Sequence, residues 1–383
     1  MEIEGRLTIN LNLSSGSVAS VEIGSSRPVA ASRLFHGKSV EDALQMVPML
    51  FSICGTAQAC AGVKACEQAM GIEPELPVAC LRQGLVNMES LREHLWRIFL
   101  EWPEFLGEEP QKENMSKALD IQKRFNATMT KEHNPFLHPG ETGDIELQIP
   151  DELEQQFGEL LQQMVFAMPA SGWLEIGDLD ELITWAASRA TVTARMLDSV
   201  IRDGWSDLGK IVMKVLPDLE SEQLYRVLED ENFIQRPKWA GECRETSSLT
   251  RVETPLLQQL RSLYGNGLLV RLVARLTEIA HLSINLIPAT INVYLSEMGR
   301  VNNSGIGQVA TARGQLLHRV DVTDGSVSRY QILAPTEWNF HPQGVVARSL
   351  NSLKGSKEQI ERQARLLISA VDPCVGYELQ ISD

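Results

Sequence analysis

Two cysteines near opposite ends of the sequence each lie at the boundary of a predicted helix. Cys54 precedes Gly55 and Thr56, where a helix is expected to start, and Cys374 follows Pro373, which must end the preceding helix. A thiolate at a helix N-terminus is favoured by the helix dipole and by free backbone N–H groups. Two such sulfurs, brought together by the fold, would form a soft metal-binding site. From spacing alone, the alternative that each cysteine is a small buried hydrophobic residue carries more weight.

The composition narrows the class of protein. With 383 residues and 43% hydrophobic residues, the chain can bury a large core in one domain or two. A net charge of −15 argues against nucleic acid and against anionic membranes as partners. No apolar run approaches the roughly 18 residues of a membrane span. The start, MEIEGRLTIN, lacks the features of a signal peptide, and the six cysteines form no CxxC, so we expect a cytoplasmic protein with reduced thiols.

Hydrophobic periodicity predicts a mixture of helices and strands. Alternation from Leu7 to Ile23 predicts a hairpin, with a possible third strand over 30–36. A second hairpin is predicted over 314–333 around the Asp324-Gly325 turn, followed by an irregular segment over 335–342. Spacings of three and four predict helices from Ser39 onward and over residues 57–70, 83–100, 151–168, 178–205, 255–264, 268–286 and 357–371. The polar segment 107–150 is predicted to be a surface insertion with one helix near 117–125.

Several polar residues have both a structural and a functional interpretation. Arg313 is either a solvated arginine or a rigid five-donor fork aimed at an anionic ligand. His94 is expected to be a helix-surface or satisfied core histidine, and Glu4 an exposed carboxylate. Cys60 and Cys66 lie about 240° apart around a helix, so we expect both to be core residues, like the remaining two cysteines.

The segment from Gly305 to Pro342, GIGQVATARGQLLHRVDVTDGSVSRYQILAPTEWNFHP, resembles the signature block of nickel–iron hydrogenase large subunits. That block has a glycine-rich start, an A-P-R-G turn, a hairpin and P-T-x-W-N. Further blocks resemble the family in the same order: Ile3-Glu4-Gly5, Phe35-His36-Gly37, Ile53-Cys54-Gly55, His94-Leu95-Trp96 and Asp372-Pro373-Cys374. The resemblance implies one α+β domain over 1–383, with a mainly helical core, small β-hairpins from both ends and the two cysteines buried between them.

The departures from the family pattern are equally informative. The active enzymes hold nickel and iron with four thiolates from two CxxC motifs, and the second cysteines are replaced here by Ala57 and Tyr377. The closing histidine is Gln380, and the R-G-x-E glutamate is Ser39, so the family's magnesium site is also expected to be absent. Ala312 replaces the proline of A-P-R-G. The resemblance therefore implies a relative that is not an enzyme and holds no nickel.

This pattern resembles the HupK/HoxV-type hydrogenase expression/formation proteins. The resemblance implies a maturation scaffold that transiently holds an iron with cyanide and carbonyl ligands on Cys54 and Cys374, while Arg313 donates a hydrogen bond to a cyanide nitrogen. Cys60 would be a third ligand if its helix were distorted. The implied partners are the small chaperone of hydrogenase maturation and the hydrogenase apo large subunit. The alternative is a metal-free regulatory protein that binds maturation chaperones by mimicking the large subunit.

Overall fold

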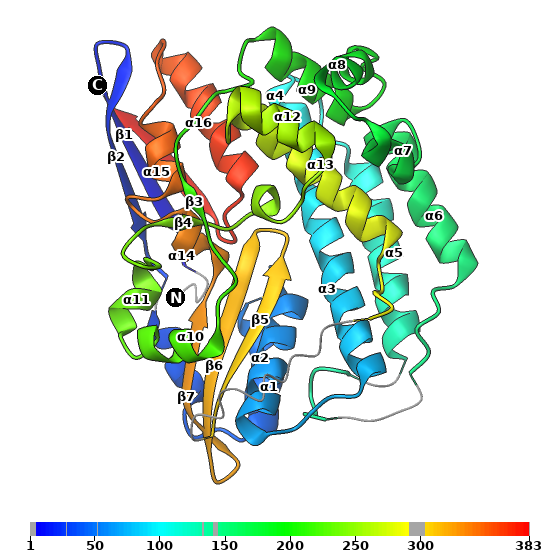
Figure 1. Cartoon of the computed structure of the whole chain (residues 1–383), viewed down its shortest axis with the longest axis vertical. Coiled ribbons are helices and arrows are strands. Elements are labelled where there is room, and N and C mark those ends of the chain that lie inside the picture. The colour runs from blue at the N-terminus through cyan, green and yellow to red at the C-terminus, as the bar shows by residue number, and fades with distance from the viewer. Residues whose placement is uncertain are drawn as a thin grey trace.

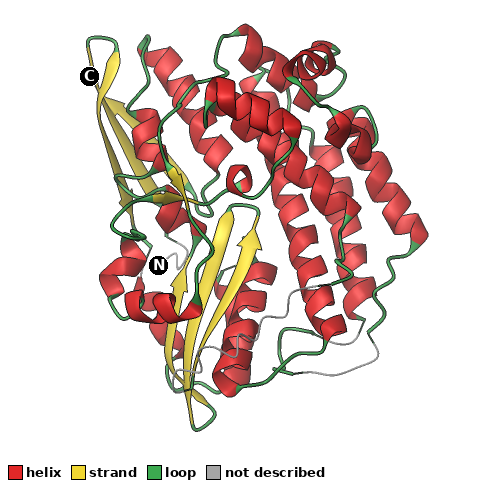
Figure 2. Cartoon of the chain, in the orientation of Figure 1, coloured by secondary structure: helices red, strands yellow, loops and turns green. Residues whose placement is uncertain are grey.

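A computed structural model describes residues 5–27, 29–51, 53–131, 134–140, 145–290 and 303–382, so Glu4 lies outside the described residues. Figure 2 shows two small sheets on one side of the molecule and most of the helices packed against them on the other. One hydrophobic core extends from Leu7 in the first strand to Val375 near the C-terminus. The predicted α+β class, with a mainly helical core and small sheets, is therefore confirmed.

The first sheet joins the two ends of the chain. Strands β1 (Leu7–Ser14) and β2 (Ser17–Ser25) form the predicted antiparallel hairpin, with Leu7, Ile9 and Leu11 buried by alternation. Strand β8 (Tyr377–Ser382) pairs in parallel with β1, giving the order β2-β1-β8 (Figure 1). This pairing carries the segment around Cys374 back to the N-terminal half of the molecule, which the sequence did not predict.

The second sheet has the order β5-β6-β7. The predicted hairpin is confirmed as β6 (Gly314–Thr323) and β7 (Ser326–Leu333), and both residues of its Asp324-Gly325 turn have positive φ. Strand β5 (Ser304–Thr311) was not predicted, because its glycines carry no strand signal. These glycines allow helix α2 (Gly55–Met70) to lie directly on the sheet, since a Cβ on Gly307 would be 1.9 Å from the carbonyl oxygen of Ala61.

The helical half confirms several predicted boundaries. Helix α1 (Val40–Leu50) begins after Ser39, whose side chain accepts from the Asp42 N–H, as the first-turn pattern predicts. Helices α12 (Pro255–Tyr264), α13 (Leu268–Ile284) and α16 (Lys357–Val371) also match their predictions closely. Helix α3 (Leu76–Trp96) starts earlier than predicted and continues through a π-helical turn, Arg97–Glu101, into α4 (Trp102–Phe105).

Other predictions need correction. The predicted strand over 30–36 is wrong, because Val29–Phe35 forms a 3-10 helix. The predicted helix over 178–205 is two helices, α8 (Leu179–Ala187) and α9 (Val192–Arg202), because Arg189 adopts a positive φ and Thr191 caps α9. The segment over 335–342 contains a short helix, α14 (Pro335–Asn339).

The polar segment 107–150 contributes to the core. Its helix α5 (Lys112–Thr130) is longer than predicted and packs on α3 through buried Ile121 and Phe125. The remaining helices and strands are α6 (Asp151–Leu161), the π-helix Gln162–Phe166, α7 (Ala170–Glu175), β3 (Lys214–Val215), α10 (Ser221–Val227), α11 (Glu231–Gln235), β4 (Arg244–Glu245), the 3-10 helix Ser248–Thr250 and α15 (Val345–Leu350). Within the described ranges, no helix combines the length and apolar character needed to cross a bilayer.

Candidate functional site

The fold brings Cys54, Cys374 and Arg313 within electrostatic reach of one another. Cys54 is the residue before α2, Cys374 lies between α16 and β8, and Arg313 lies in the turn between β5 and β6. Burial, together with charge on Cys374, raises the pKa of the Cys54 thiol to about 12, although the positive charge of Arg313 opposes the rise. Two thiols separated by 320 positions in the chain therefore lie near enough for their charges to interact with each other and with the buried guanidinium of Arg313.

The guanidinium of Arg313 is held on two sides. Its Nε donates to Asp372 Oδ1 at 3.1 Å and to the Pro373 carbonyl at 3.2 Å, and its Nη2 donates to Glu93 Oε2 at 2.6 Å. Among the residues that the structure describes, none accepts a hydrogen bond from Nη1. The guanidinium is thus fixed in orientation and retains a donor for a ligand.

The backbone of this turn is held despite the replacement of proline by Ala312. The Arg313 N–H donates to Thr311 Oγ1 at 3.2 Å, and Asn339 Nδ2 donates to the Arg313 carbonyl at 3.3 Å. Gly314 adopts a φ of +133° and a Cβ there would lie 2.5 Å from the Thr246 carbonyl oxygen, so only glycine fits.

Asp372 connects the arginine to the C-terminal cysteine. Its carboxylate lies 2.7 Å from Arg97, 3.1 Å from Arg313 and 3.6 Å from Arg275. Burial raises the pKa of this carboxyl, but the three guanidinium groups together hold it well below its usual range. Asp372 is therefore ionised. It lies two residues before Cys374 in the chain, so its ion pair with Arg313 holds this guanidinium near that cysteine.

Cys374 is paired with a hydroxyl from α14. Thr336 Oγ1 accepts from the Cys374 N–H at 3.0 Å and lies 2.7 Å from its Sγ. Because the hydroxyl oxygen already accepts from the backbone, its own hydrogen can point at the sulfur. Burial raises the pKa of Cys374, so the thiol is protonated at neutral pH, and Thr336 is the donor available to a thiolate.

Cys54 is paired with an amide that is itself oriented by other side chains. Gln58 Nε2 donates to Cys54 Sγ at 3.6 Å, and Gln58 Oε1 lies 2.7 Å from His318 Nε2. His318 Nδ1 lies 2.8 Å from the Tyr330 hydroxyl. Burial lowers the pKa of His318 to about 3, so the ring is neutral. Since Gln58 Oε1 can only accept, His318 Nε2 carries the hydrogen, and the chain of contacts points the amide N–H at the sulfur.

The sequence-based expectation that the N-terminus of the helix favours the Cys54 thiolate is wrong. The carboxylate of Glu89 on α3 accepts from the N–H groups of Thr56 at 2.8 Å and Ala57 at 2.9 Å, so these donors are not available to the sulfur. The charge of Glu89 also adds to the rise in the pKa of Cys54 that burial causes. Arg92 donates to the Ile53 carbonyl at 3.0 Å and so holds the chain just before the cysteine.

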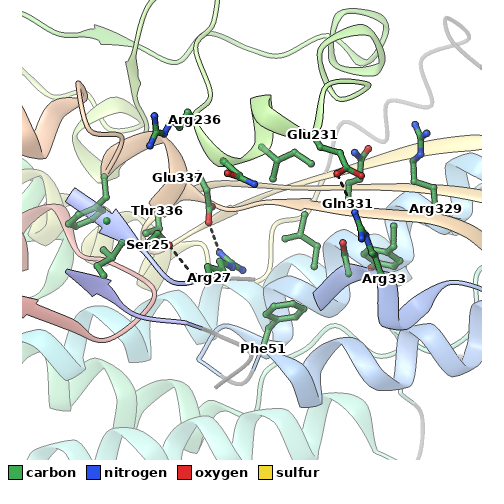
Figure 3. Close-up of a pocket in the computed structure, with 18 of the residues that line it drawn as sticks. Ser25, Arg27, Arg33, Phe51, Glu231, Arg236, Arg329, Gln331, Thr336 and Glu337 are labelled. Carbon is green, nitrogen blue, oxygen red and sulfur yellow. Dashed lines mark hydrogen bonds and ion pairs between the residues drawn. The ribbon is translucent and has the colours of Figure 1, made fainter. Parts of the chain in front are cut away.

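A second guanidinium, that of Arg27, was missed by sequence reasoning. Its Nη1 lies 3.0 Å from Glu337 Oε1, and its Cζ lies 5.5 Å from the centre of the Phe51 ring (Figure 3). Charge on either thiol, Cys54 or Cys374, interacts favourably with it. Arg27 sits at the end of an edge strand in an unremarkable serine-rich context, which gives no sequence signal for a site residue.

A pocket of about 1060 Å³ leads towards Cys374. It lies between the 3-10 helix Val29–Phe35, the edges of β2 and β7, and helices α11 and α14 (Figure 3). Thr336, which touches Cys374 Sγ, is part of its lining, and so are Arg27 and Glu337. The pocket thus reaches to within one side chain of a thiol.

Three of the positions that depart from the hydrogenase pattern have structural roles within their own elements. Ala57 is buried and Ser39 caps α1. Gln380 is exposed on β8, where its side-chain amide donates a hydrogen bond to the carboxylate of Glu378. No group of three or more histidine, cysteine or acidic side chains in the described part of the chain could hold a metal ion. Cys60 is fully buried on α2, as predicted for a core residue, and among the described residues it forms no group of three metal-binding side chains with Cys54 and Cys374.

The other predicted polar residues have structural roles. His94 is a core residue, with Nε2 3.0 Å from Glu278 Oε2. Cys66 and Cys80 are buried, as predicted. Cys243 is only partly buried and lies 3.3 Å from His341 Nδ1, so its assignment to the core holds in part.

The arrangement of elements is that of the hydrogenase large subunits. Over 94% of both chains, the structure is similar to the Ni-Fe-Se hydrogenase from D. vulgaris Hildenborough, with a TM-score of 0.63 and 15% identity. The family model for nickel-dependent hydrogenase matches residues 271–376, which include Arg313 and Cys374. The structural similarity therefore confirms the fold class that the resemblance of the sequence to hydrogenase large subunits had implied.

Similarity over the full length identifies a narrower group. The hydrogenase expression/formation protein HupV of Azotobacter chroococcum mcd 1 is 30% identical over 98% of both chains. The hydrogenase expression/formation protein HupK of Azotobacter vinelandii is 29% identical, also over 98% of both. The chain belongs to this family of hydrogenase expression/formation proteins.

Proposed function

We propose that this chain is a non-catalytic scaffold of hydrogenase maturation. It holds an iron with cyanide and carbonyl ligands between Cys54 and Cys374 and passes it to the apo large subunit. The observation that supports the proposal is that Cys54 lies near enough to Cys374 and to Arg313 for their charges to interact, while Nη1 of Arg313 is left without an acceptor among the described residues. The family's names, which refer to hydrogenase expression and formation, support the same role.

Loading the iron requires that both thiols lose their protons. Burial raises both pKa values, so the empty site is neutral at the sulfurs and each bound iron displaces two protons. The thiolates then accept from Gln58 and Thr336, and their charge is balanced by Arg27 and Arg313. Nη1 of Arg313 is the donor for a cyanide nitrogen.

Release follows from the small number of protein ligands. The site offers two sulfurs where the enzymes offer four, because Ala57 and Tyr377 replace the other cysteines. A receiving large subunit with four thiolates therefore competes favourably for the same iron, and the thiols left behind regain their protons. The same shortage of ligands argues against nickel and against a catalytic bimetallic centre.

The partners in this proposal are the small chaperone of the maturation pathway, which delivers the iron, and the apo large subunit, which receives it. The six cysteines are all unpaired, which fits a reducing cytoplasm as the place of exchange.

Infrared spectroscopy of protein produced together with the maturation proteins tests the proposal. We expect cyanide and carbonyl stretching bands in the wild type and their loss in Cys54→Ala and in Cys374→Ala. Cys243→Ala is the control, because this cysteine contacts His341 and is not one of the two proposed ligands, and it should retain the bands. Elemental analysis should find iron and little nickel. Stoichiometric nickel, or bands that survive both substitutions, would refute the scaffold.

The second candidate is a metal-free protein that binds maturation chaperones by mimicry of the large subunit. The raised pKa values of both thiols favour it, because neutral thiols form a stable site without any metal. Wild-type protein that binds the chaperone and shows no cyanide or carbonyl bands would support this alternative.

A further inference from the structure

We propose that the pocket beside the two thiols binds an extended, carboxylate-bearing segment of the protein that delivers the iron. This inference rests on the proposed function, and it names the surface through which that exchange takes place. The pocket is lined by the edges of β2 and β7 and by helices α11 and α14 (Figure 3).

The charge of the pocket is opposite to that of the chain. The protein carries a net charge of −15, yet the pocket lining contains four arginines and two glutamates. Each glutamate is paired with an arginine: Glu337 with Arg27 at 3.0 Å and Glu231 with Arg33 at 3.4 Å. The two other arginines, Arg236 and Arg329, leave the lining with an excess of positive charge, as a carboxylate-bearing partner requires.

The carboxylate of Asp321 offsets only part of this excess. It lies 3.7 Å from Arg329 and is not part of the pocket lining, and it is shared with Arg319 at 3.2 Å. Arg236 makes no ion pair with any residue in the described ranges. These two guanidinium groups are therefore available at the rim to meet the carboxylates of a partner.

The size and walls of the pocket favour a peptide segment over a small anion. Its volume of about 1060 Å³ is at the upper end of the roughly 300–1000 Å³ of pockets that enclose drug-sized ligands, far more than an iron with diatomic ligands occupies. Ser328 to Ile332 of β7 and Ile23 to Ser25 of β2 form two of its walls, and both strands are the edges of their sheets. Edge strands offer backbone donors and acceptors to an extended chain.

The outer edge of β7 is only partly used within the protein. Val327 exchanges backbone hydrogen bonds with the segment Gly37–Lys38. Beyond Val327, among the described residues, only β6 provides backbone partners to this strand. An extended segment could therefore continue the pairing along the wall of the pocket, with its carboxylates towards the rim guanidinium groups of Arg236 and Arg329.

The inner end of the pocket explains why such a segment would deliver iron. Thr336 lines the pocket and contacts Cys374 Sγ at 2.7 Å, and Arg27, which also lines the pocket, interacts electrostatically with both thiols. A donor group carried on the bound segment would be one side chain away from the acceptor sulfur. Ligand exchange needs this proximity, and a surface contact elsewhere on the chain would not provide it.

Photo-cross-linking with the purified small chaperone of hydrogenase maturation tests the proposal. A photoreactive amino acid is placed at the exposed Ser328 in the pocket and, as a control, at the exposed Lys117 on α5, and the cross-linked peptides are identified by mass spectrometry. We expect cross-links from Ser328, and not from Lys117, to an acidic segment of the chaperone. Cross-links only to a second copy of this chain, or only to a basic segment, would overturn the inference.

Charge reversal provides a second readout. The double variant Arg236→Glu/Arg329→Glu changes the two exposed rim arginines, and Arg202→Glu/Arg365→Glu changes two exposed arginines outside the pocket, each paired with an acid on its own helix. We expect the rim variant to bind the chaperone at least about tenfold more weakly and the control to bind within about twofold of the wild type, with equal thermal stability.

The failure of this inference is distinguishable from failure of the proposed function. If the wild type shows cyanide and carbonyl bands while the rim variant binds the chaperone as tightly as the wild type does, the pocket is not the docking site and the scaffold stands. If rim-dependent cross-links form while the cyanide and carbonyl bands are absent, the docking site is supported and the proposal that the protein carries iron is refuted.

Discussion

The hydroxyl of Thr336 offers the sharpest test of how the site is held. It accepts from the Cys374 N–H at 3.0 Å and lies 2.7 Å from Cys374 Sγ, and both residues are buried. Thr336→Val keeps the shape of the side chain and removes the oxygen. The buried N–H then loses its acceptor, which costs about 1–3 kcal/mol, and no cavity contributes to the loss. We therefore expect the free energy of unfolding to fall by that amount in urea denaturation.

The same substitution should also affect the sulfur. A hydrogen bond to a charged group is worth about 1.5–3 kcal/mol, so its loss should raise the pKa of Cys374, which burial already raises, still further. Ultraviolet titration of the thiolate in a Cys54→Ser background measures this change. Iron binding at fixed pH should weaken by about ten- to a hundredfold, because one thiolate becomes harder to form.

Thr336→Ser is the matched control, because it keeps the oxygen and loses only a methyl group. It should retain most of the unfolding free energy and the pKa of Cys374. A Thr336→Val protein within about 0.5 kcal/mol of the wild type, or a Thr336→Ser protein that loses as much stability, would refute the assigned role of the hydroxyl.

Three further results are expected. Because burial raises the pKa of both site thiols, iron affinity should rise with pH by up to about a hundredfold per pH unit around neutrality, and a pH-independent affinity would contradict the two-proton exchange. Burial raises the pKa of Glu278, but Arg251, His94 and Ser248 together outweigh it and lower the pKa to about 2, so the stabilising contribution of this carboxylate is present above its unfolded pKa and lost as pH falls from about 4.5 towards 2. Glu278→Gln should accordingly lower the free energy of unfolding by roughly 3 kcal/mol at neutral pH, and the unfolding free energy of the variant should depend less on pH between about 4.5 and 2. Denaturation at several pH values measures both effects. Gly307→Ala should prevent folding or cost more than about 3 kcal/mol, whereas Gly24→Ala, with no atom within 4 Å of the added Cβ, should cost far less; equal thermal stability of the two would show that α2 does not rest on β5.

The segments with strong local signals could be predicted from the sequence. The Asp324-Gly325 turn set the register of one hairpin, and Ser39 at a helix start was confirmed as a cap. Local signals failed where tertiary contacts override them. Strand β5 is rich in glycine because α2 packs against its backbone, and β8 is a six-residue strand that exists only because β1 accepts it in parallel.

Some residues of the candidate site could likewise be predicted from the sequence, and others could not. Cys54, Cys374 and Arg313 were found through their motifs, which are contiguous in sequence. Arg27 and Thr336 reach the site from separate elements. No spacing rule connects residues that meet only because both chain ends enter one sheet.

The sequence by itself determined the family resemblance, the loss of two of the four thiolates at Ala57 and Tyr377, and most of the helices, because each of these depends on residues that are close together along the chain. The tertiary structure alone decided the chemistry of the remaining thiols. It buried both, gave the N–H groups of Thr56 and Ala57 to Glu89, and placed guanidinium groups close by. A pKa depends on solvent exclusion and on charges that are near in space, and the distance between residues along the chain carries neither.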